Sequence, residues 1–521
     1  MGRDPKQSVR RALLHSLGIT RDELSKPFVA VVNSFTEIVP GHAHLQKLAE
    51  KVKDGIRSAG GVPFEFNTIA ICDGLAGDRV KTKHSFSPCD LIADSIEVMI
   101  KTYRFDAMVM LPSCSVSIPG HLMAAARLNI PTVVLTGGPM QPGRWREKPL
   151  TAIDVDKIVE RAKGRRLREL ELSKVEEIAC PGAGSCPVMN PTNAMMCLTE
   201  ALGMSLPRCA TTPAQSAEKL RLAKKSGFRS VRLLRQGIKT SKIMTREAFE
   251  NTIRVAVSLG CEFEAFLHLP AIAEEFGIDL DASTFERIGE ETPQLCALKP
   301  NGPHTILDLH NGGGIPAVMK RLENSLNLQA LTVSGKTLKE TIAKAETPDP
   351  NVILPPSKPV RPKSALVILR GNLAPGGAVI RDIPPKTDKC RGPAKVFENL
   401  EEAMRAVDAD EIEAGDIMVI RYEGQRSGKW MRELTGIARL LREKKLEKFV
   451  PLITDGRLPS QGGLSIELVR PEAAEGGPIA AIENGDEIEI NIPERRIEVS
   501  LTEREIKGRL KKLFFSKHKK T

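Results

Sequence analysis

The 521-residue chain is long enough for two or three domains, and with 41% hydrophobic residues it can bury substantial cores. It has no run of about 18 apolar residues, as a membrane-spanning helix would need. The N-terminus MGRDPKQSVRR also lacks the apolar block of a secretory signal. We therefore expect a cytoplasmic protein with no membrane partner. The net charge of +11 does not indicate a nucleic-acid partner, because no basic motif is interleaved with aromatic residues and the C-terminal tail carries part of the excess.

Residues 28–136 alternate apolar, strand-like runs with helical patterns. The strand-like runs are FVAVVNSF, FNTIAIC, DAMVMLPSC and TVVLTGG. This order predicts βαβ units around a parallel sheet flanked by helices. Ligands bind at the carboxyl ends of the strands in such sheets, so Asn33–Ser34, Cys72–Asp73–Gly74 and Ser113–Cys114 should approach one another.

The remainder of the chain changes character twice. A mainly helical region ends near residue 345, and residues 346–364 then hold six prolines in 19 residues, which is typical of an extended linker. The short alternating runs beyond it favour a β-rich, barrel-like second domain over further βαβ units. We therefore predict an N-terminal α/β domain over 1–345, a linker over 346–364 and a C-terminal domain over 365–521 that ends in a basic tail.

Ten cysteines are scattered along the chain, and without a secretory signal their thiols should stay reduced. Cys114 and Cys186 differ from the others because each lies in a small-residue turn flanked by glycine or proline. A free cysteine is more often a buried apolar side chain than a ligand. The two lie too far apart for a compact zinc or ferredoxin motif, so only the fold can bring them to a shared metal.

Two carboxylates also follow apolar runs. Asp73 in ICDGLAGD lies at the expected ligand edge of the sheet, where it can hold a hard cation such as Mg2+. Glu423 closes the run VIRYEG. The simpler alternatives are a turn residue at Asp73 and a solvated strand end at Glu423, and spacing alone does not choose between these alternatives.

Together these segments resemble the dihydroxy-acid and phosphogluconate dehydratase family. The resemblance rests on collinear runs such as KPFVAVVNSFTEIVPGHAHL, EFNTIAICDG, MAAARLNIPTVVLTGGPM, CPGAGSC, CLTEALGMSLP, IMVIRYEG and LITDGR. It implies a hydro-lyase that removes water from a 2,3-dihydroxy acid or a sugar acid to give a 2-keto acid. It also implies an iron-sulfur cluster, 2Fe-2S or 4Fe-4S, as Lewis acid, Mg2+ to hold the anionic substrate, a serine base and a homodimer or homotetramer.

Carried over residue by residue, the resemblance places cluster ligands at Cys114 and Cys186 and Mg2+ carboxylates at Asp73 and Glu423. A third cluster cysteine of one subgroup corresponds here to Gly41, as in the subgroup that has glycine at this position. The third ligand therefore stays open, with three candidates: Cys72, Cys89 and Cys180.

The chain departs from the family in the loops that carry the chemistry. The family's Cys-Asp-Lys is Cys114-Ser115-Val116 here, so a second Mg2+ carboxylate and a lysine that can become a ligand are missing. Its Ala-Met-Gly-His is Ala76-Gly77-Asp78-Arg79, and its Gly-Gly-Ser-Thr-Asn is Gly260-Cys261-Glu262-Phe263-Glu264. In the C-terminal domain, the loop of the serine base is one residue shorter, which leaves Ser460 as the candidate base.

Three functions fit this combination. The first is a dehydratase with altered substrate or metal use, in which Arg79, Arg426 and Lys429 bind the anionic substrate and other carboxylates, from Asp78, Glu262 or Glu264, replace the missing ones. The second is a non-catalytic paralogue that keeps the fold as a partner or regulator of a true dehydratase. The third is a standard dihydroxy-acid dehydratase of valine and isoleucine biosynthesis. We favour the first, because the changes cluster at the active-site loops.

Overall fold

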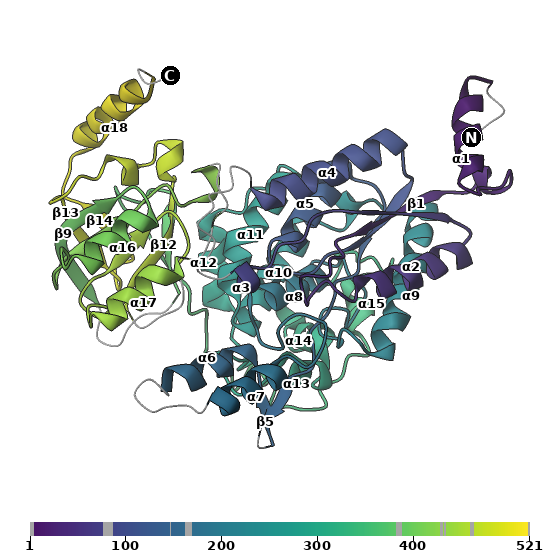
Figure 1. The fold of residues 1–521 in the computed structure, drawn as a ribbon, viewed down its shortest axis with the longest axis horizontal. Coiled ribbons are helices and arrows are strands. Elements are labelled where there is room, and N and C mark those ends of the chain that lie inside the picture. Colours follow the sequence, from purple (N-terminus) through teal and green to yellow (C-terminus); the bar gives the residue numbers. More distant parts are fainter. Residues whose placement is uncertain are drawn as a thin grey trace. The chain divides into compact units, whose positions relative to one another are not determined.

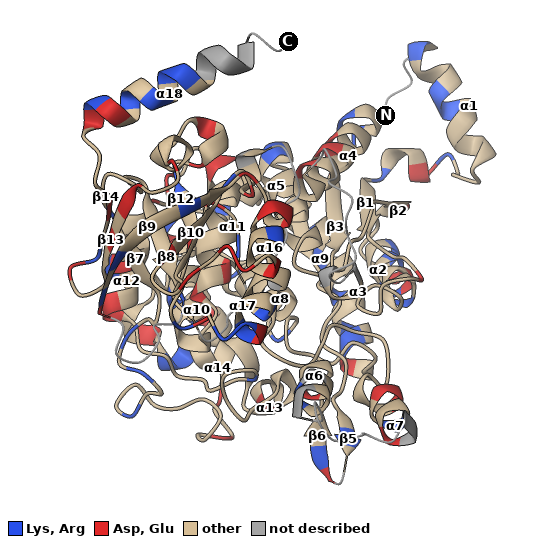
Figure 2. Cartoon of the chain, turned by 60° about the vertical axis from the view of Figure 1, so that its left-hand side comes forward, with Lys and Arg blue, Asp and Glu red and all other residues tan. Residues whose placement is uncertain are grey.

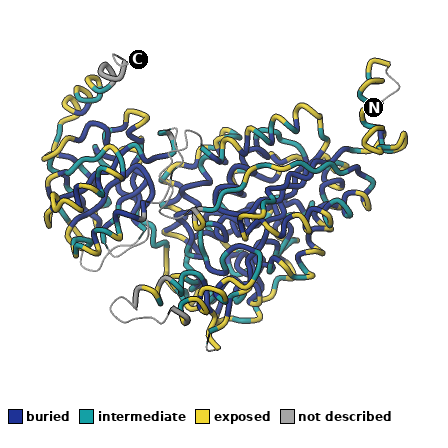
Figure 3. The backbone as a smooth tube through the Cα atoms, viewed as in Figure 1, coloured by how far each residue is buried: buried dark blue, intermediate teal, exposed yellow. Residues whose placement is uncertain are grey.

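A computed structural model of the chain describes residues 5–76, 87–145, 147–161, 169–381, 388–427, 431, 434–458 and 463–518. The chain divides into two compact units (Figure 1). Unit 1 comprises Met1–Cys72, Pro88–Leu280 and Glu291–Lys363, and unit 2 comprises Asp73–Ser87, Asp281–Glu290 and Ser364–Thr521. In each unit the buried residues gather around the sheet and its covering helices (Figure 3).

Unit 1 is built on a four-stranded parallel sheet in the order β2-β1-β3-β4. The strands are β1 (Phe28–Asn33), β2 (Val62–Asn67), β3 (Ala107–Leu111) and β4 (Thr132–Val134). All residues of β1 and β3 are buried, as expected for central strands covered on both faces. The predicted parallel sheet flanked by helices is therefore confirmed.

One strand boundary differs from the prediction. The apolar run FNTIAIC was expected to form a strand ending at Cys72, but β2 is VPFEFN and ends at Asn67. Asn67 pairs with Asn33, and the Thr68 N–H donates to the Asn33 carbonyl, so the ladder closes there. Cys72 therefore lies five positions beyond the strand end, just before the short helix α3 (Asp73–Ala76).

Helices of unit 1 surround this sheet. Those close to it are α2 (Leu45–Ser58), α4 (Pro88–Tyr103), α5 (Ser117–Leu128) and α9 (Ala217–Arg235). Helices α2 and α9 pack at very short range, since a Cβ on Gly55 would lie 1.9 Å from the Lys224 carbonyl oxygen. The other elements are α1 (Ser8–Ser16), β5 (Gly143–Trp145), β6 (Lys148–Leu150), α6 (Ala152–Arg161), α7 (Glu169–Ala179), α8 (Pro191–Ala201), α10 (Arg246–Leu259), α11 (Glu262–Glu274), α13 (Ile306–Asn311), α14 (Gly314–Arg321) and α15 (Leu338–Ile342).

Unit 2 is built on an eight-stranded, barrel-like sheet in the order β14-β13-β9-β10-β11-β12-β8-β7. Its strands are β7 (Val367–Leu369), β8 (Gly377–Ile380), β9 (Lys389–Phe397), β10 (Ile417–Ile420), β11 (Leu452–Thr454), β12 (Ser465–Arg470), β13 (Glu487–Asn491) and β14 (Arg496–Val499). The two edges nearly close on each other. The Arg370 N–H, just after β7, donates to the Arg495 carbonyl, and the Ile497 N–H of β14 donates to the Arg370 carbonyl. The predicted barrel-like domain is confirmed.

The middle of this sheet was not anticipated. Strands β9 to β12 are parallel, and the helices α16 (Leu400–Asp408) and α17 (Thr435–Glu443) lie in the connections between them. Unit 2 also contains most of α12 (Ala282–Glu291), and α18 (Glu503–His518), which carries part of the basic tail (Figure 2). Among the described residues, no helix is both long and apolar enough to cross a membrane.

Candidate active site

Cys114 lies in the turn between β3 and α5, at the carboxyl end of the central part of the sheet. Its φ is +71°, in the left-handed region that L-amino acids other than asparagine and aspartate rarely adopt. The Cys114 carbonyl accepts the Ile118 N–H at 3.2 Å, which ties this conformation to the first turn of α5. Ser115 and Val116 are buried, with 8% and 7% of their surface exposed, so the two positions that depart from the family lie inside the protein.

The loop of Cys186 interlocks with two other loops. The Gly184 N–H donates to the Pro40 carbonyl at 2.9 Å, and the Ser185 N–H donates to the Gly138 carbonyl at 3.0 Å. On the other side, the Asn193 side chain donates to the Cys186 carbonyl at 2.5 Å. The N-terminus of α8 therefore anchors the loop of Cys186 from behind.

Gly41 shows that the two cysteine loops adjoin. A Cβ placed on Gly41 would lie 3.3 Å from Ser113 Oγ, 3.5 Å from Cys114 Sγ and 3.8 Å from the Gly184 carbonyl oxygen. The fold thus brings together the turn of Cys114 and the loop of Cys186, which are far apart in sequence. The glycine leaves open the space beside Cys114 that a side chain at this position would enter.

The three candidates for a third thiol ligand differ in their surroundings. The pKa of the Cys186 thiol is raised to about 11, mainly by burial and further by the neighbouring thiols of Cys180 and Cys72. Cys89 instead donates its thiol to the Val116 carbonyl at 3.3 Å. Cys72 and Cys180 therefore lie near Cys186, whereas the thiol of Cys89 is directed at the turn after Cys114.

Unpartnered polar atoms surround the Cys114 turn. His42 Nδ1 donates to the Ser34 carbonyl at 2.7 Å and His121 Nδ1 donates to the Ser117 carbonyl at 2.7 Å. Neither Nε2 makes a well-formed hydrogen bond to a described residue, although the His42 imidazole lies beside the Ser113 backbone. The pKa of each imidazole is lowered to about 4, with burial as the first cause, so both are neutral at pH 7. The hydroxyls of Ser113 and Ser117 also find no hydrogen-bond partner in the described part of the chain. Such a concentration of unsatisfied groups is typical of a site that binds something.

These buried polar side chains were missed by sequence reasoning. His42 lies within VPGHAHL and His121 within SIPGH, both beside residues already identified as candidates. A lone histidine in an apolar helix gives no signal by itself. Its proximity in sequence to a strand end and to a glycine-proline turn is the only available indication.

Glu423 lies in unit 2, just after β10, and is buried with 9% of its surface exposed. Its Oε1 accepts the Leu400 N–H at 3.0 Å, at the start of α16. The Glu423 N–H in turn donates to Asp455 Oδ1 at 3.0 Å. The carboxylate of Glu423 therefore has a structural role in unit 2, and the solvated strand end considered as its alternative is wrong.

Asp455 is a second buried carboxylate in this part of unit 2. Besides Glu423, it accepts the N–H groups of Tyr422 at 3.1 Å and Ala473 at 3.0 Å. Burial raises its pKa although these three hydrogen bonds oppose the shift. Asp455 follows β11 in LITDGR. The pattern that identified Glu423, an acid after an apolar strand, could therefore have identified Asp455 as well.

Six of the remaining predicted site residues fall where the structure gives no side-chain description. Arg79 and Asp78 lie in 77–86, Lys429 in 428–430 and Ser460 in 459–462. The side chains of Asp73 and Arg426 are likewise outside the description. Glu262 and Glu264 are described and are buried in α11, which packs against α5 and α8. Glu264 lies 3.6 Å from His268.

The donors that are described suit iron and sulfide better than a single hard cation. Within the described ranges, no three His, Cys, Asp or Glu side chains come together as ligands of one metal ion. The thiols of a cluster, however, bind different irons and need not converge on one point. Soft sulfur ligands at adjoining loops, with unpartnered hydroxyls beside them, fit an iron-sulfur cluster.

Comparison with known proteins agrees with this geometry. Residues 26–341 match the family described as dihydroxy-acid/6-phosphogluconate dehydratase N-terminal, and residues 351–521 match its C-terminal counterpart. The chain belongs to the dihydroxy-acid/6-phosphogluconate dehydratase family. Dihydroxy-acid dehydratase 1 of Methanosarcina acetivorans is 45% identical over 512 residues, which cover 97% of this chain and 93% of the relative.

Two further members of the family show the same degree of similarity. The dihydroxy-acid dehydratase of Methanothrix thermoacetophila is 46% identical over 506 residues, covering 96% of this chain and 91% of the relative. That of Halothermothrix orenii is 45% identical over 510 residues, covering 97% and 93%. The resemblance inferred from the motifs is thus confirmed, and it extends through both units.

Proposed function

We propose that this chain is a hydro-lyase that converts a 2,3-dihydroxy acid or a sugar acid to a 2-keto acid, with altered substrate or metal use. One observation carries the proposal. Cys114 is held in a left-handed conformation, which costs about 1–3 kcal/mol, and unpartnered polar atoms surround it. A protein with only a structural role has no use for this strain or for these unsatisfied groups.

The cofactor we propose is an iron-sulfur cluster held by Cys114, Cys186 and a third thiol. The proximity of Cys72 and Cys180 to Cys186 favours one of these two over Cys89. When bound, the cluster supplies a Lewis acid for the leaving hydroxyl. The hydroxyls of Ser113 and Ser117 can donate to sulfide, and the neutral imidazoles of His42 and His121 can accept from the hydroxyls of the substrate.

The proposed metal and substrate contacts rest on the resemblance. Asp73 and Glu423 would hold Mg2+, with fewer oxygen ligands than the family has because Ser115 and Val116 replace an aspartate and a lysine. Val116 is apolar and cannot act as a ligand. Anionic substrate would be bound by Arg79, Arg426 and Lys429, and Ser460 would take the proton. We propose that the chain works as a homodimer or homotetramer.

Anaerobic turnover tests the proposed reaction. Protein purified without oxygen is given a panel of 2,3-dihydroxy acids and sugar acids, with and without Mg2+, and 2-keto acid is measured. We expect product from at least one substrate, with a weak dependence on Mg2+. Strongly Mg2+-dependent turnover of dihydroxyisovalerate would instead identify a standard dehydratase of valine and isoleucine biosynthesis, which the names of the relatives favour.

Iron and sulfide analysis tests the cofactor separately. Cys114→Ser and Cys186→Ser should each lower the iron content per chain, whereas Cys197→Ser, in the buried part of α8, should not. The second candidate function is a non-catalytic partner of a true dehydratase, which the buried apolar Val116 favours. It predicts normal iron content without product from any substrate.

A further inference from the structure

Lys219 is a fully buried cation in the first turn of α9. Its backbone N–H donates to the N-cap Ser216 Oγ at 3.1 Å, so its charge lies at the positive end of the helix dipole, where a cation is unfavourable. Its Nζ donates to the Cys209 carbonyl at 2.6 Å and lies 3.7 Å from Cys209 Sγ. Among the described residues, no carboxylate forms an ion pair with it. A buried charge in this position needs a compensating charge from elsewhere.

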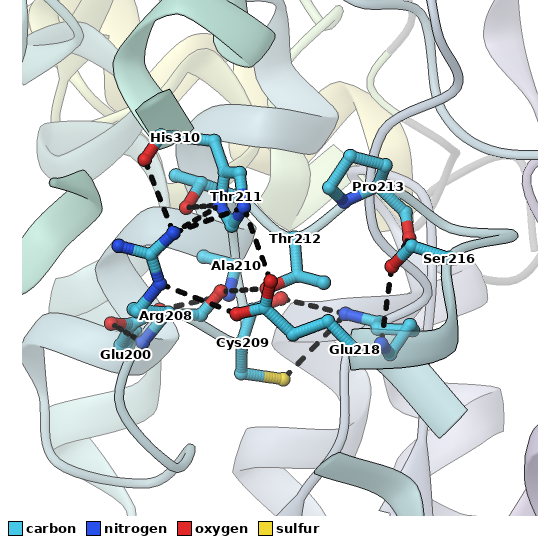
Figure 4. A network of polar contacts seen from close by, with 11 residues as sticks. Glu200, Arg208, Cys209, Ala210, Thr211, Thr212, Pro213, Ser216, Glu218 and His310 are labelled. Carbon is cyan, nitrogen blue, oxygen red and sulfur yellow. Dashed lines mark hydrogen bonds and ion pairs between the residues drawn. The ribbon is translucent and has the colours of Figure 1, made fainter. Parts of the chain in front are cut away.

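The acids nearest to Lys219 are engaged by other groups (Figure 4). Glu200 uses both oxygens to accept the N–H groups of Arg208 at 2.6 Å and Ala210 at 2.8 Å, and burial raises its pKa to about 7. Glu218 lies 3.3 Å from Arg208 and 3.5 Å from His310. Neither carboxylate forms an ion pair with Lys219 Nζ. Burial lowers the pKa of Lys219, and the attraction of Cys209, Glu200 and Glu218 offsets this effect only in part.

The candidate site lies on the other side of a two-glycine turn from Lys219. A Cβ on Gly138 would lie 3.1 Å from Lys219 Nζ, and the Gly138 carbonyl accepts the Ser185 N–H, beside Cys186. A Cβ on Gly137 would lie 2.9 Å from Ser113 Oγ, beside Cys114. Among the described residues, the backbone of Gly137 and Gly138 therefore lies between the ammonium group and the residues that flank both cysteines.

The charge of Lys219 acts across this turn. His44 Nε2 donates to the Gly137 carbonyl of this turn at 2.9 Å. The pKa of His44 is lowered to about 4, first by burial and in part by the positive charge of Lys219. In the low dielectric of the interior such an interaction is only weakly screened.

We propose that Lys219 is a positioning residue whose buried positive charge offsets the negative charge of the thiolate-bound group held at Cys114 and Cys186. The inference rests on the proposed function, because that function supplies the anionic cluster. Net charge around a cluster sets its reduction potential, and a nearby cation stabilises the reduced, more negative state. Lys219 thus raises the potential without contacting iron, sulfide or substrate.

Lys219→Met tests this proposal, since methionine keeps much of the side-chain volume and removes the charge. Lys225→Met, on an exposed part of the same helix, is the matched control. In anaerobically isolated holoprotein, we expect the reduction potential of Lys219→Met to shift to more negative values, while Lys225→Met leaves it in place. An unchanged potential in Lys219→Met would overturn the proposal.

The metal-free protein provides a test that does not need the cluster. Without the anion, the charge of Lys219 is compensated only in part by Glu200 and Glu218, so Lys219→Met should have a Tm equal to or above that of the wild type. If the lysine merely held the Cys209 carbonyl, the variant would melt at a lower temperature than Lys225→Met, and the proposal would be wrong. A wild-type protein without iron or sulfide would refute the proposed cofactor and this role of Lys219 with it. An unchanged potential in a protein that does hold the cluster would refute the role of Lys219 alone.

Discussion

At the scale of single residues, Cys114 combines a special backbone conformation with a special side chain. A left-handed conformation costs an L-residue about 1–2 kcal/mol relative to glycine, so replacement by glycine should relieve strain. In metal-free protein we expect Cys114→Gly to be about 1 kcal/mol more stable to urea unfolding than Cys114→Ala. Both variants remove the thiol, so the difference between them reports the backbone alone.

The matched comparison uses Cys197, which is also buried but lies inside α8. There glycine should be less stable than alanine by about 0.5–1 kcal/mol, because it loses more conformational freedom on folding. The two cysteines should therefore give opposite signs. The same sign at both positions would show that the Cys114 turn is not strained, and the main support for the proposed function would be lost.

His121 gives a pH dependence whose sign follows from burial. Its pKa falls from 6.5 to about 4 in the folded protein, because burial disfavours the charged imidazolium. The stabilisation is complete above pH 6.5 and is lost as the pH falls from 6.5 towards 4, since the unfolded chain then binds the proton more readily. A separation of this size corresponds to on the order of 3 kcal/mol.

Urea unfolding of metal-free protein between pH 7 and pH 4 measures this effect. The free energy of unfolding should fall less steeply with decreasing pH for His121→Gln than for wild type. His15→Gln, at an exposed position in α1, should keep the wild-type slope. Equal slopes for all three proteins would mean that His121 can be protonated in the folded state at no cost.

At the scale of elements, Glu423 joins β10 to α16 through the Leu400 N–H. Glu423→Ala leaves this buried donor unpaired and should destabilise metal-free protein by about 1–3 kcal/mol. Glu423→Gln keeps an acceptor and should remain close to wild type, as should Glu411→Ala at an exposed position. Glu423→Gln removes the charge but keeps the acceptor for the Leu400 N–H. If Glu423 holds Mg2+ as proposed, turnover of this variant should therefore respond less to added Mg2+. Equal destabilisation by alanine and glutamine would show that the carboxylate is needed for the fold itself.

The elements also show how far the sequence alone can lead. The buried strands β1 and β3 are continuous apolar runs and were predictable, as was the cysteine turn after β3. Strand β9 was missed because it contains Gly392 and Pro393, residues that argue against a central strand. Strand β2 was placed too late because the apolar run TIAIC follows it.

The site itself was predictable only in part. Cys114 and Cys186 could be identified as unusual, but their juxtaposition depends on tight backbone approaches at Gly41 and at the Gly137–Gly138 turn. No sequence pattern encodes which loops meet at such glycines. For the same reason the third thiol stayed open, and Lys219 on an ordinary amphipathic helix gave no sign of its complete burial.

At the scale of the whole molecule, α1 presents an apolar stripe that none of the described residues covers. Val9, Leu13 and Leu17 recur every four residues and are 64–73% exposed, and α1 has no buried residue. Arg10 donates to the Tyr103 carbonyl at the end of α4, which places the two helices close together. Helix α4 in turn exposes Leu91 and Val98. It also carries Asp90 and Asp94, which both form ion pairs with Arg127 but stay largely exposed.

A second copy of the chain would cover both surfaces at once, because the basic, apolar α1 of one copy would complement the acidic, apolar α4 of the other. We therefore expect the purified protein to be a dimer or a larger even assembly in light scattering after size exclusion. Leu13→Asp should lower the mass to that of one chain, whereas Phe449→Asp, at an exposed apolar position in unit 2, should not. If Leu13→Asp keeps the wild-type mass, the copies meet through another surface. A carboxylate buried at the centre of this stripe would lose more free energy of hydration than the apolar contact contributes to association.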